Sequence, residues 1–325
     1  MLNLMNGGKI MGDKNEVVKN LDFLGVDASF IIQEMFLGYK YRKHNGSLYS
    51  NDADVPTKLI KLYYTLKPTG VSFDEMKKAF VRRYVLNESK LENVHGEEEM
   101  AGFEKMYEYI HSDDINYRFD VYTLKDLHRL LFSCVPDASF GGDFRNSPAW
   151  IPGSRAELAD WTEIRYRLDM LDKDVQFLLE MGELVKDSGD VDLMLQYLDE
   201  CVELNAKLIK VHPFADGNGR TIRGFTNKLL ENVGFPPIYV KASEKEEYRA
   251  AMNKAINEED YADLKGFYRY KICDSIIELD INDTVRKYNR NRKDIFDVTS
   301  STALSIPDSG AKVMQKRRDE TKKNN

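Results

Sequence analysis

Residues 212–223 read HPFADGNGRTIR and stand between two segments in which apolar residues recur every three or four positions. The preceding segment runs from about Asp192 to Lys210, and the following one from Ile222 to Val233. In the preceding segment, one helical stripe holds Met194, Tyr197, Leu198, Cys201, Leu204, Leu208 and Val211, and the outward face holds Asp199, Glu200, Glu203 and Lys207. We therefore expect a loop that leaves one helix and enters the N-terminus of the next.

The composition of this loop is typical of an anion-binding site. Gly217 and Gly219 allow positive φ angles and a close approach of backbone N–H groups to an anion. The helix dipole adds partial positive charge at the same place. Arg220 and Arg223 lie three positions apart on the first turn of the second helix, so both guanidinium groups can reach one polyphosphate.

Two further residues of the loop carry chemical groups. Asp216 comes directly before Gly217, where its carboxylate could hold Mg²⁺ against the same phosphates or could instead cap the helix. His212 has an unperturbed pKa near neutral and could take a proton from an attacking hydroxyl. The other histidines are interpreted as structural or solvent-exposed, with His128 packed within its own helix.

The loop resembles the signature of the Fic family, HxFx(D/E)GNGRxxR, at every fixed position. The resemblance extends more weakly from about Asn87 to Tyr270. Residues 124–131, with His128, are similar to the first core helix of the family, residues 142–154 to its flap, and residues 248–267 to its closing helices. The first 80 or so residues show no such match.

The resemblance implies an all-α, Fic-type helical core that transfers AMP from ATP to a Ser, Thr or Tyr hydroxyl of a target protein and releases pyrophosphate. The protein itself is a further candidate target. The implied roles are a general base at His212, an Mg²⁺ ligand at Asp216, an anion hole of Gly217, Asn218 and Gly219, a phosphate ligand at Arg220, a γ-phosphate ligand at Arg223, and a core anchor at Phe214.

Residues 88–93 resemble the inhibitory helix of many Fic proteins, in which (S/T)xxxE(G/N) places a glutamate against the second arginine of the motif. Glu92 followed by Asn93 fits the end of this pattern, which implies that Glu92 pairs with Arg223 and blocks the γ-phosphate. Only two residues separate Ser89 from Glu92, so the supporting serine fits less well. The same Ser89 and Glu92 also form a capping box for a helix that starts near Val94, and this alternative stays open.

Two other functions are compatible with the resemblance. The first is transfer of another phosphate-containing group, such as a different nucleotide, phosphocholine, or the γ-phosphate as in Doc kinases. Doc kinases are similar but typically carry lysine at the position of Gly219, so Gly219 favours nucleotide transfer. The second is a silenced regulatory or toxin-type interaction module, which the intact His212, Asp216, Arg220 and Arg223 disfavour.

Composition restricts the partners. The 325 residues carry 47 Lys plus Arg and 54 Asp plus Glu, a formal net charge of −7, which argues against a protein that binds mainly nucleic-acid phosphates. No run approaches a membrane span, and residues 1–16 lack the apolar stretch of a signal peptide. The three cysteines form neither a disulfide framework nor a CxxC motif. We expect a cytoplasmic protein, whose target protein and oligomeric state the sequence leaves open.

The chain is expected to divide into four parts. Residues 1–85 form an N-terminal helical region with helices near 30–41, 57–66 and 72–83, the last with a capping box at Ser72 and Glu75. Residues 86–275 form the core, in which 97–132 gives two helices broken near 111–116, and 142–154, rich in glycine and proline, gives a short β-hairpin flap. Residues 276–298 are a C-terminal helical extension, and 299–325 a disordered tail.

Overall fold

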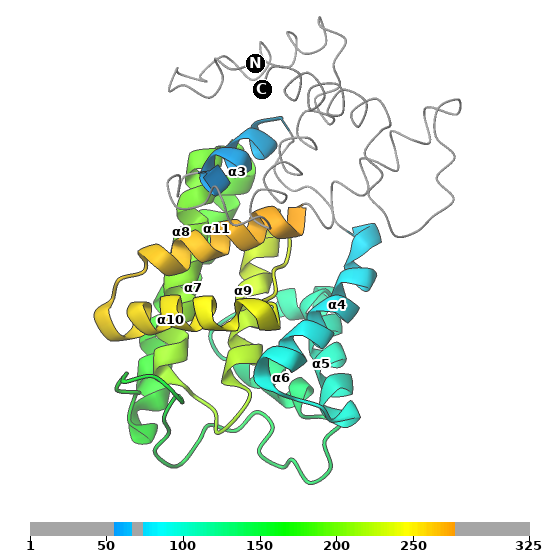
Figure 1. Cartoon of the computed structure of the whole chain (residues 1–325), viewed down its shortest axis with the longest axis vertical. Helices are drawn as coiled ribbons and strands as arrows, with labels where there is room; N and C mark the ends of the chain where they lie inside the picture. Colours follow the sequence, from blue (N-terminus) through cyan, green and yellow to red (C-terminus); the bar gives the residue numbers. More distant parts are fainter. Residues whose placement is uncertain (1–54, 67–73, 277–325) are drawn as a thin grey trace, which may run out of the picture. The chain divides into compact units, whose positions relative to one another are not determined.

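The structure, a computed structural model, describes residues 55–66 and 74–276 (Figure 1). Over these ranges the chain forms helices and loops without any strand, which confirms the predicted all-α class. The helices are α3 (Val55–Leu66), α4 (Asp74–Glu92), α5 (Glu97–Ile110), α6 (Thr123–Leu131), α7 (Ile164–Ser188), α8 (Val191–Val211), α9 (Asn218–Asn232), α10 (Lys245–Glu258) and α11 (Ala262–Ile276). Short 3₁₀ turns lie at Asp113–Tyr117, Trp161–Glu163 and Ala242–Glu244.

Most of the predicted helices are found where they were expected. Helix α3 matches the prediction for 57–66, and α5 and α6 match the two helices of 97–132. Helix α4 runs through residues 85 and 86, so the expected boundary between the N-terminal region and the core falls inside a helix. The predicted helix at 30–41, the start of a helix at Ser72 and, apart from Ile276, the predicted extension and tail lie outside the described residues.

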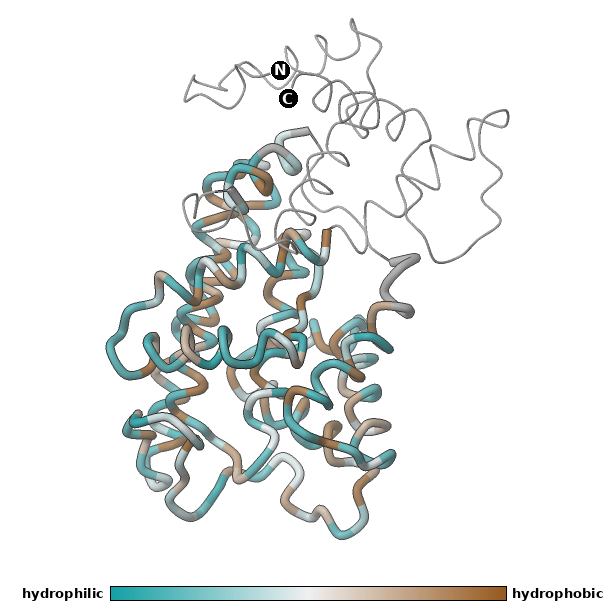
Figure 2. Tube along the Cα trace, in the orientation of Figure 1, coloured by the Kyte–Doolittle hydropathy of each residue, from teal (hydrophilic) through white to brown (hydrophobic). Residues whose placement is uncertain are grey.

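Helix α8 lies at the centre of the described helices and packs against α3, α7, α9, α10 and α11 (Figure 1). All seven residues of its predicted apolar stripe are buried. Figure 2 shows the same alternation of hydrophobic and hydrophilic residues along the other helices. Two acidic residues expected on the outward face, Asp199 and Glu203, instead form ion pairs with Arg269 and Lys265 of α11, at 2.7 Å each.

Two glycines allow helices to approach closely around the start of α9. A Cβ atom on Gly102 of α5 would overlap the backbone carbonyl oxygen of Leu131 in α6. A Cβ atom on Gly224 of α9 would lie 2.8 Å from the terminal methyl group of Met106 in α5. Helix α5 therefore packs against the backbone of α6 at Gly102, and its side chains pack against the backbone of α9 at Gly224.

The predicted hairpin at residues 142–154 is not found, and this segment is an irregular loop. Pro148 and Pro152 have no backbone N–H and cannot donate to a strand ladder. The backbone N–H of Arg145 donates to the carbonyl of Pro213, 2.9 Å away, so this part of the segment pairs with the loop before α9 and not with a second strand. Among the described helices, none is both long and apolar enough to span a membrane.

We predict that Gly102→Ala lowers the melting temperature because α5 and α6 must separate to admit the new methyl group, at a cost of about 1–3 kcal/mol. Gly266→Ala in α11 is the matched control, since no atom lies within 4 Å of the added Cβ. This control should raise stability by about 0.5–1 kcal/mol through helix propensity. Thermal unfolding followed by circular dichroism measures both, and equal shifts for the two variants would contradict the close approach.

Candidate active site

The motif loop is short because two helices end and begin with left-handed backbone. Helix α8 is terminated by His212 at φ +50°, and Gly217 at φ +73° is the N-cap of α9. A side chain at Gly217 would also lie 2.7 Å from the ring of Phe132, so this position requires glycine. Helix α9 begins at Asn218, four residues earlier than the apolar pattern from Ile222 predicted.

Asn218 and Phe214 close the loop on itself. The side-chain amide of Asn218 donates to the Phe214 carbonyl at 2.7 Å, and its oxygen accepts the Phe214 N–H at 2.9 Å. Phe214 is fully buried and stacks on the ring of His128 with centroids 3.9 Å apart, which confirms its role as a core anchor. The side chain of Asn218 is thus used to shape the loop, and only its backbone N–H remains for an anion.

His128 joins α6 to two loops, the motif loop (residues 212–217) and the flap loop (residues 142–154). Its sequence context did not reveal this role. Its Nδ1 accepts the N–H of Gly142 at 2.8 Å, and its Nε2 lies 3.0 Å from the Asp216 carbonyl, so Nε2 carries the proton. Burial lowers the pKa of His128 to about 4, although the Asp216 carbonyl opposes this shift. The ring is therefore neutral at pH 7 and fixes both loops.

Arg145 is a second residue that the sequence analysis missed. Its side chain is buried and donates to the backbone carbonyls of Ser147, Ala159 and His212, the last at 2.7 Å from Nε. A further contact of 3.4 Å reaches the carbonyl of Val211. Arg145 thereby satisfies carbonyls at the end of α8 that have no helical partner, and it ties the flap loop to His212.

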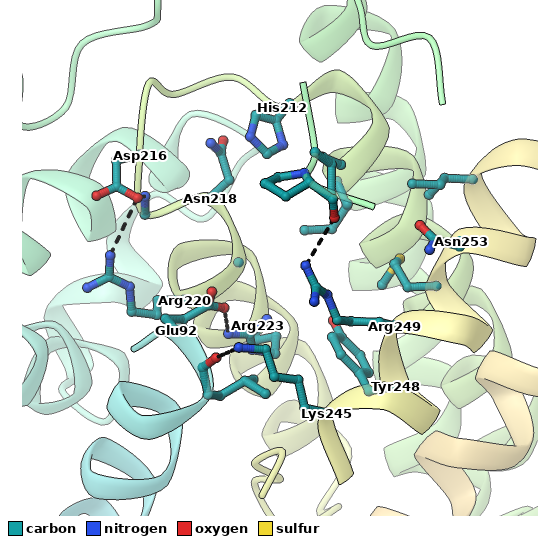
Figure 3. Close-up of a pocket in the computed structure, with 18 of the residues that line it drawn as sticks. Glu92, His212, Asp216, Asn218, Arg220, Arg223, Lys245, Tyr248, Arg249 and Asn253 are labelled. Atoms are coloured by element: carbon teal, nitrogen blue, oxygen red, sulfur yellow. Dashed lines mark hydrogen bonds and ion pairs between the residues drawn. The ribbon is translucent and has the colours of Figure 1, made fainter. Parts of the chain in front are cut away.

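A cavity of about 430 Å³ lies over the motif loop, and Figure 3 shows its lining. The loop and α9 contribute His212, Asp216, Gly217, Asn218, Gly219, Arg220 and Arg223. Helix α10 faces them with Lys245, Tyr248, Arg249 and Asn253, the flap loop adds Trp150, Ile151 and Pro152, and α4 adds Glu92. The structure therefore brings Glu92 and all the motif residues with a predicted catalytic, phosphate-binding or metal-binding role to one cavity, whereas Ser89 does not line it.

The start of α9 has donors for an anion. The first turn of a helix leaves its N–H groups without intrahelical acceptors, which applies here to Asn218 and Gly219. The buried Nε of Arg220 has no hydrogen-bond partner among the described residues. The outer nitrogens of Arg220 pair with Glu99 of α5 and, at 3.7 Å, with Asp216.

Arg223 is buried and paired with two carboxylates of α4. Its Nη2 lies 2.5 Å from Glu92 and 2.5 Å from Glu88, and its Nε donates to Glu88 at 2.6 Å. Burial raises the pKa of Glu92, but the charge and hydrogen bond of Arg223, together with the charges of Arg220 and Lys245, outweigh burial and leave this pKa below its usual value. Burial also raises the pKa of Glu88, and there it outweighs the attraction of Arg223.

The helix bounds exclude one of the two interpretations of residues 88–93. Ser89 lies inside α4 and Glu92 is the last residue of that helix, whereas α5 begins only at Glu97 after the N-cap Gly96. The capping-box interpretation of Ser89 and Glu92 is therefore wrong. The Ser89 hydroxyl is buried without a hydrogen-bond partner in the described part of the chain, so it does not support Glu92.

His212 is a neutral imidazole at the edge of the cavity. Burial lowers its pKa to about 4, although a backbone hydrogen bond with Ile209 and the charges of Asp216 and Glu92 oppose this shift. A neutral imidazole can accept a proton at pH 7 without first losing one. This protonation state is the one that a general base needs.

Asp216 offers a carboxylate that fits Mg²⁺. Its side chain is 70% exposed and faces the cavity, with one oxygen accepting the N–H of Gly217 at 2.7 Å (Figure 3). The described residues hold no cluster of three or more potential ligands, so they form no complete protein cage for a metal. Mg²⁺ usually takes one or two carboxylates and completes its shell with water and substrate phosphates, a requirement that Asp216 meets.

Comparison with known proteins identifies a family domain that contains residues 212–223. Residues 118–230 match the sequence model of the Fic/DOC family. The chain is 28% identical over 175 residues to the protein adenylyltransferase Fic of Aedes aegypti, which is 53% of this chain and 31% of that protein. It is 42% identical over 97 residues to the protein adenylyltransferase fic-1 of Caenorhabditis briggsae, 29% of this chain and 18% of that one.

A solved structure gives the same fold. The crystal structure of a Fic-domain signalling protein from Bacteroides thetaiotaomicron superposes with a TM-score of 0.50 at 17% identity, and the match covers 75% of this chain and all of that one. The chain spans about a third of the length of the curated relatives first matched. Residues 118–230 are therefore a domain of the Fic/DOC family.

Proposed function

We propose that this protein is a protein adenylyltransferase that transfers AMP from ATP to a hydroxyl side chain of a target protein. The observation that carries the proposal is the single cavity in which His212, Asp216, the start of α9 and both motif arginines meet. The names of the curated relatives support the same activity. Substrate, nucleotide and regulation are proposals for this chain, because it spans only part of those relatives.

In the proposed reaction the target hydroxyl oxygen attacks the α-phosphorus of ATP while the bond to the leaving pyrophosphate breaks. His212 accepts the hydroxyl proton. The N–H groups at the start of α9 and the guanidinium of Arg220 stabilise the charge on the phosphate oxygens, and Arg223 holds the γ-phosphate. Asp216 would hold Mg²⁺, which supplies charge neutralisation of the triphosphate.

The flap loop is the proposed docking place of the target segment. Trp150 is 77% exposed beside the cavity, and two contacts fix the loop to α10. Arg249 donates to the carbonyl of Pro152 at 3.0 Å, and Asn253 to that of Gly153 at 3.3 Å. Backbone groups of such a loop can pair with an extended peptide and set its hydroxyl against His212.

The environment of Gly219 favours nucleotide transfer over transfer of the γ-phosphate. A Cβ atom on Gly219 would lie 2.6 Å from the carboxylate of Glu92 and 2.8 Å from Nη1 of Arg223. The lysine of the Doc kinases at this position would collide with that ion pair. The glycine therefore leaves the start of α9 open to a phosphate group.

We expect the wild-type protein to be inhibited by Glu92. The Glu92 carboxylate occupies the guanidinium group that the γ-phosphate requires, so productive ATP must first displace it. The Glu92 side chain is 35% exposed on the cavity side, and Lys245 of α10 donates to the carbonyl of Leu91 at 2.6 Å, next to it. The end of α4 is thus held beside the nucleotide site from two directions.

The function is tested by incubating purified Glu92→Gly protein with labelled ATP, CTP, GTP or UTP and Mg²⁺ in a cell lysate. Mass spectrometry of the labelled peptides then identifies the transferred group and its acceptor. Transfer of AMP to a hydroxyl side chain is the expected result. Label from the γ-position of ATP on the target would favour a kinase, and no transfer of any label would favour a silenced module.

We predict that His212→Ala in the Glu92→Gly background lowers the rate of AMP transfer by about 10² to 10⁴ while ATP binding stays nearly unchanged. The reason is that the proposed base contacts the hydroxyl nucleophile and not the nucleotide. A labelled-ATP assay and calorimetry on the same proteins measure the two quantities. More than half of the parent's rate in the variant would exclude His212 as the base.

The pKa of His212 gives a second prediction. Because burial lowers this pKa to about 4, the imidazole stays unprotonated as the pH falls from 8 to 5. The transfer rate of Glu92→Gly should therefore show no decline with a midpoint near 6.5 and should fall only as the pH approaches about 4. A pH profile of the rate under single-turnover conditions checks this, and a midpoint near 6.5 would contradict a desolvated base.

We predict that Glu92→Gly transfers AMP to itself and to targets about 10 to 100 times faster than the wild type, because one charge-assisted hydrogen bond no longer competes with ATP. Self-modification and melting temperature are measured on the same two proteins. If Glu92 only stabilises the end of α4, the variant should have a lower melting temperature and no higher rate of transfer. That result would contradict the inhibitory role of Glu92.

A further inference from the structure

Helix α4 presents two carboxylates to Arg223, and they differ in their surroundings. Glu88 and Glu92 are four residues apart and so lie on the same face of the helix. Glu92 is 35% exposed at the cavity, whereas Glu88 is completely buried. Only Glu92 lines the cavity, which means that a nucleotide entering there meets Glu92 and not Glu88.

Glu88 holds Arg223 from a buried position outside the cavity lining. One oxygen of Glu88 takes both Nε and Nη2 of Arg223, at 2.6 and 2.5 Å. The other oxygen accepts the backbone N–H of Val240 at 3.0 Å, so the carboxylate itself cannot rotate freely. The Nη1 nitrogen of Arg223 lies at the start of α9, 2.8 Å from the place of a Cβ atom on Gly219.

We propose that Glu88 is a positioning residue, which keeps the Arg223 guanidinium aimed at the cavity after Glu92 has been displaced. This proposal rests on the proposed function, in which Arg223 holds the γ-phosphate. With Glu92 gone, Glu88 still fixes the Nε edge, and Nη1 and Nη2 form the open edge toward the nucleotide. Glu88 also neutralises a buried cation that would otherwise lose its only counter-ion when Glu92 leaves.

The contact between Glu88 and Arg223 is tested in the absence of nucleotide, by NMR of protein labelled with ¹⁵N in arginine. A buried Nε–H that donates to a carboxylate exchanges slowly with solvent, and Arg223→Lys assigns the Arg223 signal by its loss. We expect this slowly exchanging signal in the wild type and in Glu92→Gly, and its disappearance or fast exchange in Glu92→Gly/Glu88→Gln. Retention of the protected signal in the double variant would overturn the proposal.

The consequence for the nucleotide is tested by calorimetry with ATP and with ADP, in Mg²⁺. In Glu92→Gly/Glu88→Gln we expect ATP binding to weaken about tenfold relative to Glu92→Gly, about 1.4 kcal/mol, with ADP binding nearly unchanged. Single-turnover transfer should fall at saturating ATP as well. ATP binding equal to or tighter than that of the parent would show that Glu88 only balances charge, which would overturn the positioning role.

Glu92→Gly/Glu244→Gln is the matched control. Glu244 is also a buried carboxylate with a cationic partner, Lys271 at 2.9 Å, but it does not line the cavity. Its removal should lower the melting temperature without changing the ratio of ATP to ADP affinity. A changed ratio in this control would assign the effect of Glu88→Gln to general loss of stability and overturn the proposal.

A second pair of variants applies if Glu92→Gly/Glu88→Gln does not fold. The affinities for ATP and ADP are compared between Glu92→Gly/Arg223→Gln and the triple variant that also carries Glu88→Gln. Neither protein has a guanidinium for Glu88 to position, and the triple variant has no unpaired buried charge at this place. If Glu88 acts through Arg223, the ratio of ATP affinity to ADP affinity should be the same in both proteins. A further loss of ATP affinity in the triple variant overturns the proposal. If Glu92→Gly itself does not prefer ATP over ADP, the proposed role of Arg223 fails, while the Nε–H signal still decides whether Glu88 holds it.

Discussion

A guanidinium group buried among helices is the constraint on which the arrangement around the cavity depends. Arg223 is only 6% exposed, and an unpaired charge at such a place costs several kcal/mol. Helix α4 must therefore keep Glu88 and Glu92 within contact distance of this guanidinium. The ring of Tyr248 from α10 lies 5.7 Å from the same guanidinium. One cation thus joins α4, α9 and α10, three helices that line the cavity.

The second constraint is the short path between α8 and α9. Both helix ends use left-handed backbone, which is unstrained for Gly217 but costs about 1 kcal/mol or more for a residue such as His212. Arg145 opposes this cost by donating to the carbonyl of His212. The strained residue and the open N-terminus of α9 consequently line the same cavity.

The sequence predicted those parts of the site that depend on neighbours along the chain. The motif and the α8 stripe are local patterns, and both were found as predicted. Arg145, His128 and Glu88 act on partners 67, 88 and 135 residues away, which no local pattern reveals. The capping-box interpretation of Ser89 and Glu92 failed for another reason. The same spacing fits a helix start and a helix end, and only the contact of α4 with Arg223 distinguishes them. Helix α7 was not predicted because it carries apolar residues on both faces, buried ones such as Val175 and exposed ones such as Phe177.

A site built from two arginines and a helix N-terminus attracts carboxylates for the same reason that it attracts phosphates. Three glutamates serve as counter-ions here, and their side chains differ in exposure: 35% for Glu92, 22% for Glu99 and zero for Glu88. A carboxylate that touches solvent recovers hydration when a phosphate replaces it, so exchange at Glu92 costs little beyond the contact itself. A fully buried carboxylate recovers none and stays in place. In the proposed function, the exposure of each glutamate would therefore separate the counter-ions that a nucleotide displaces from the one that remains with Arg223.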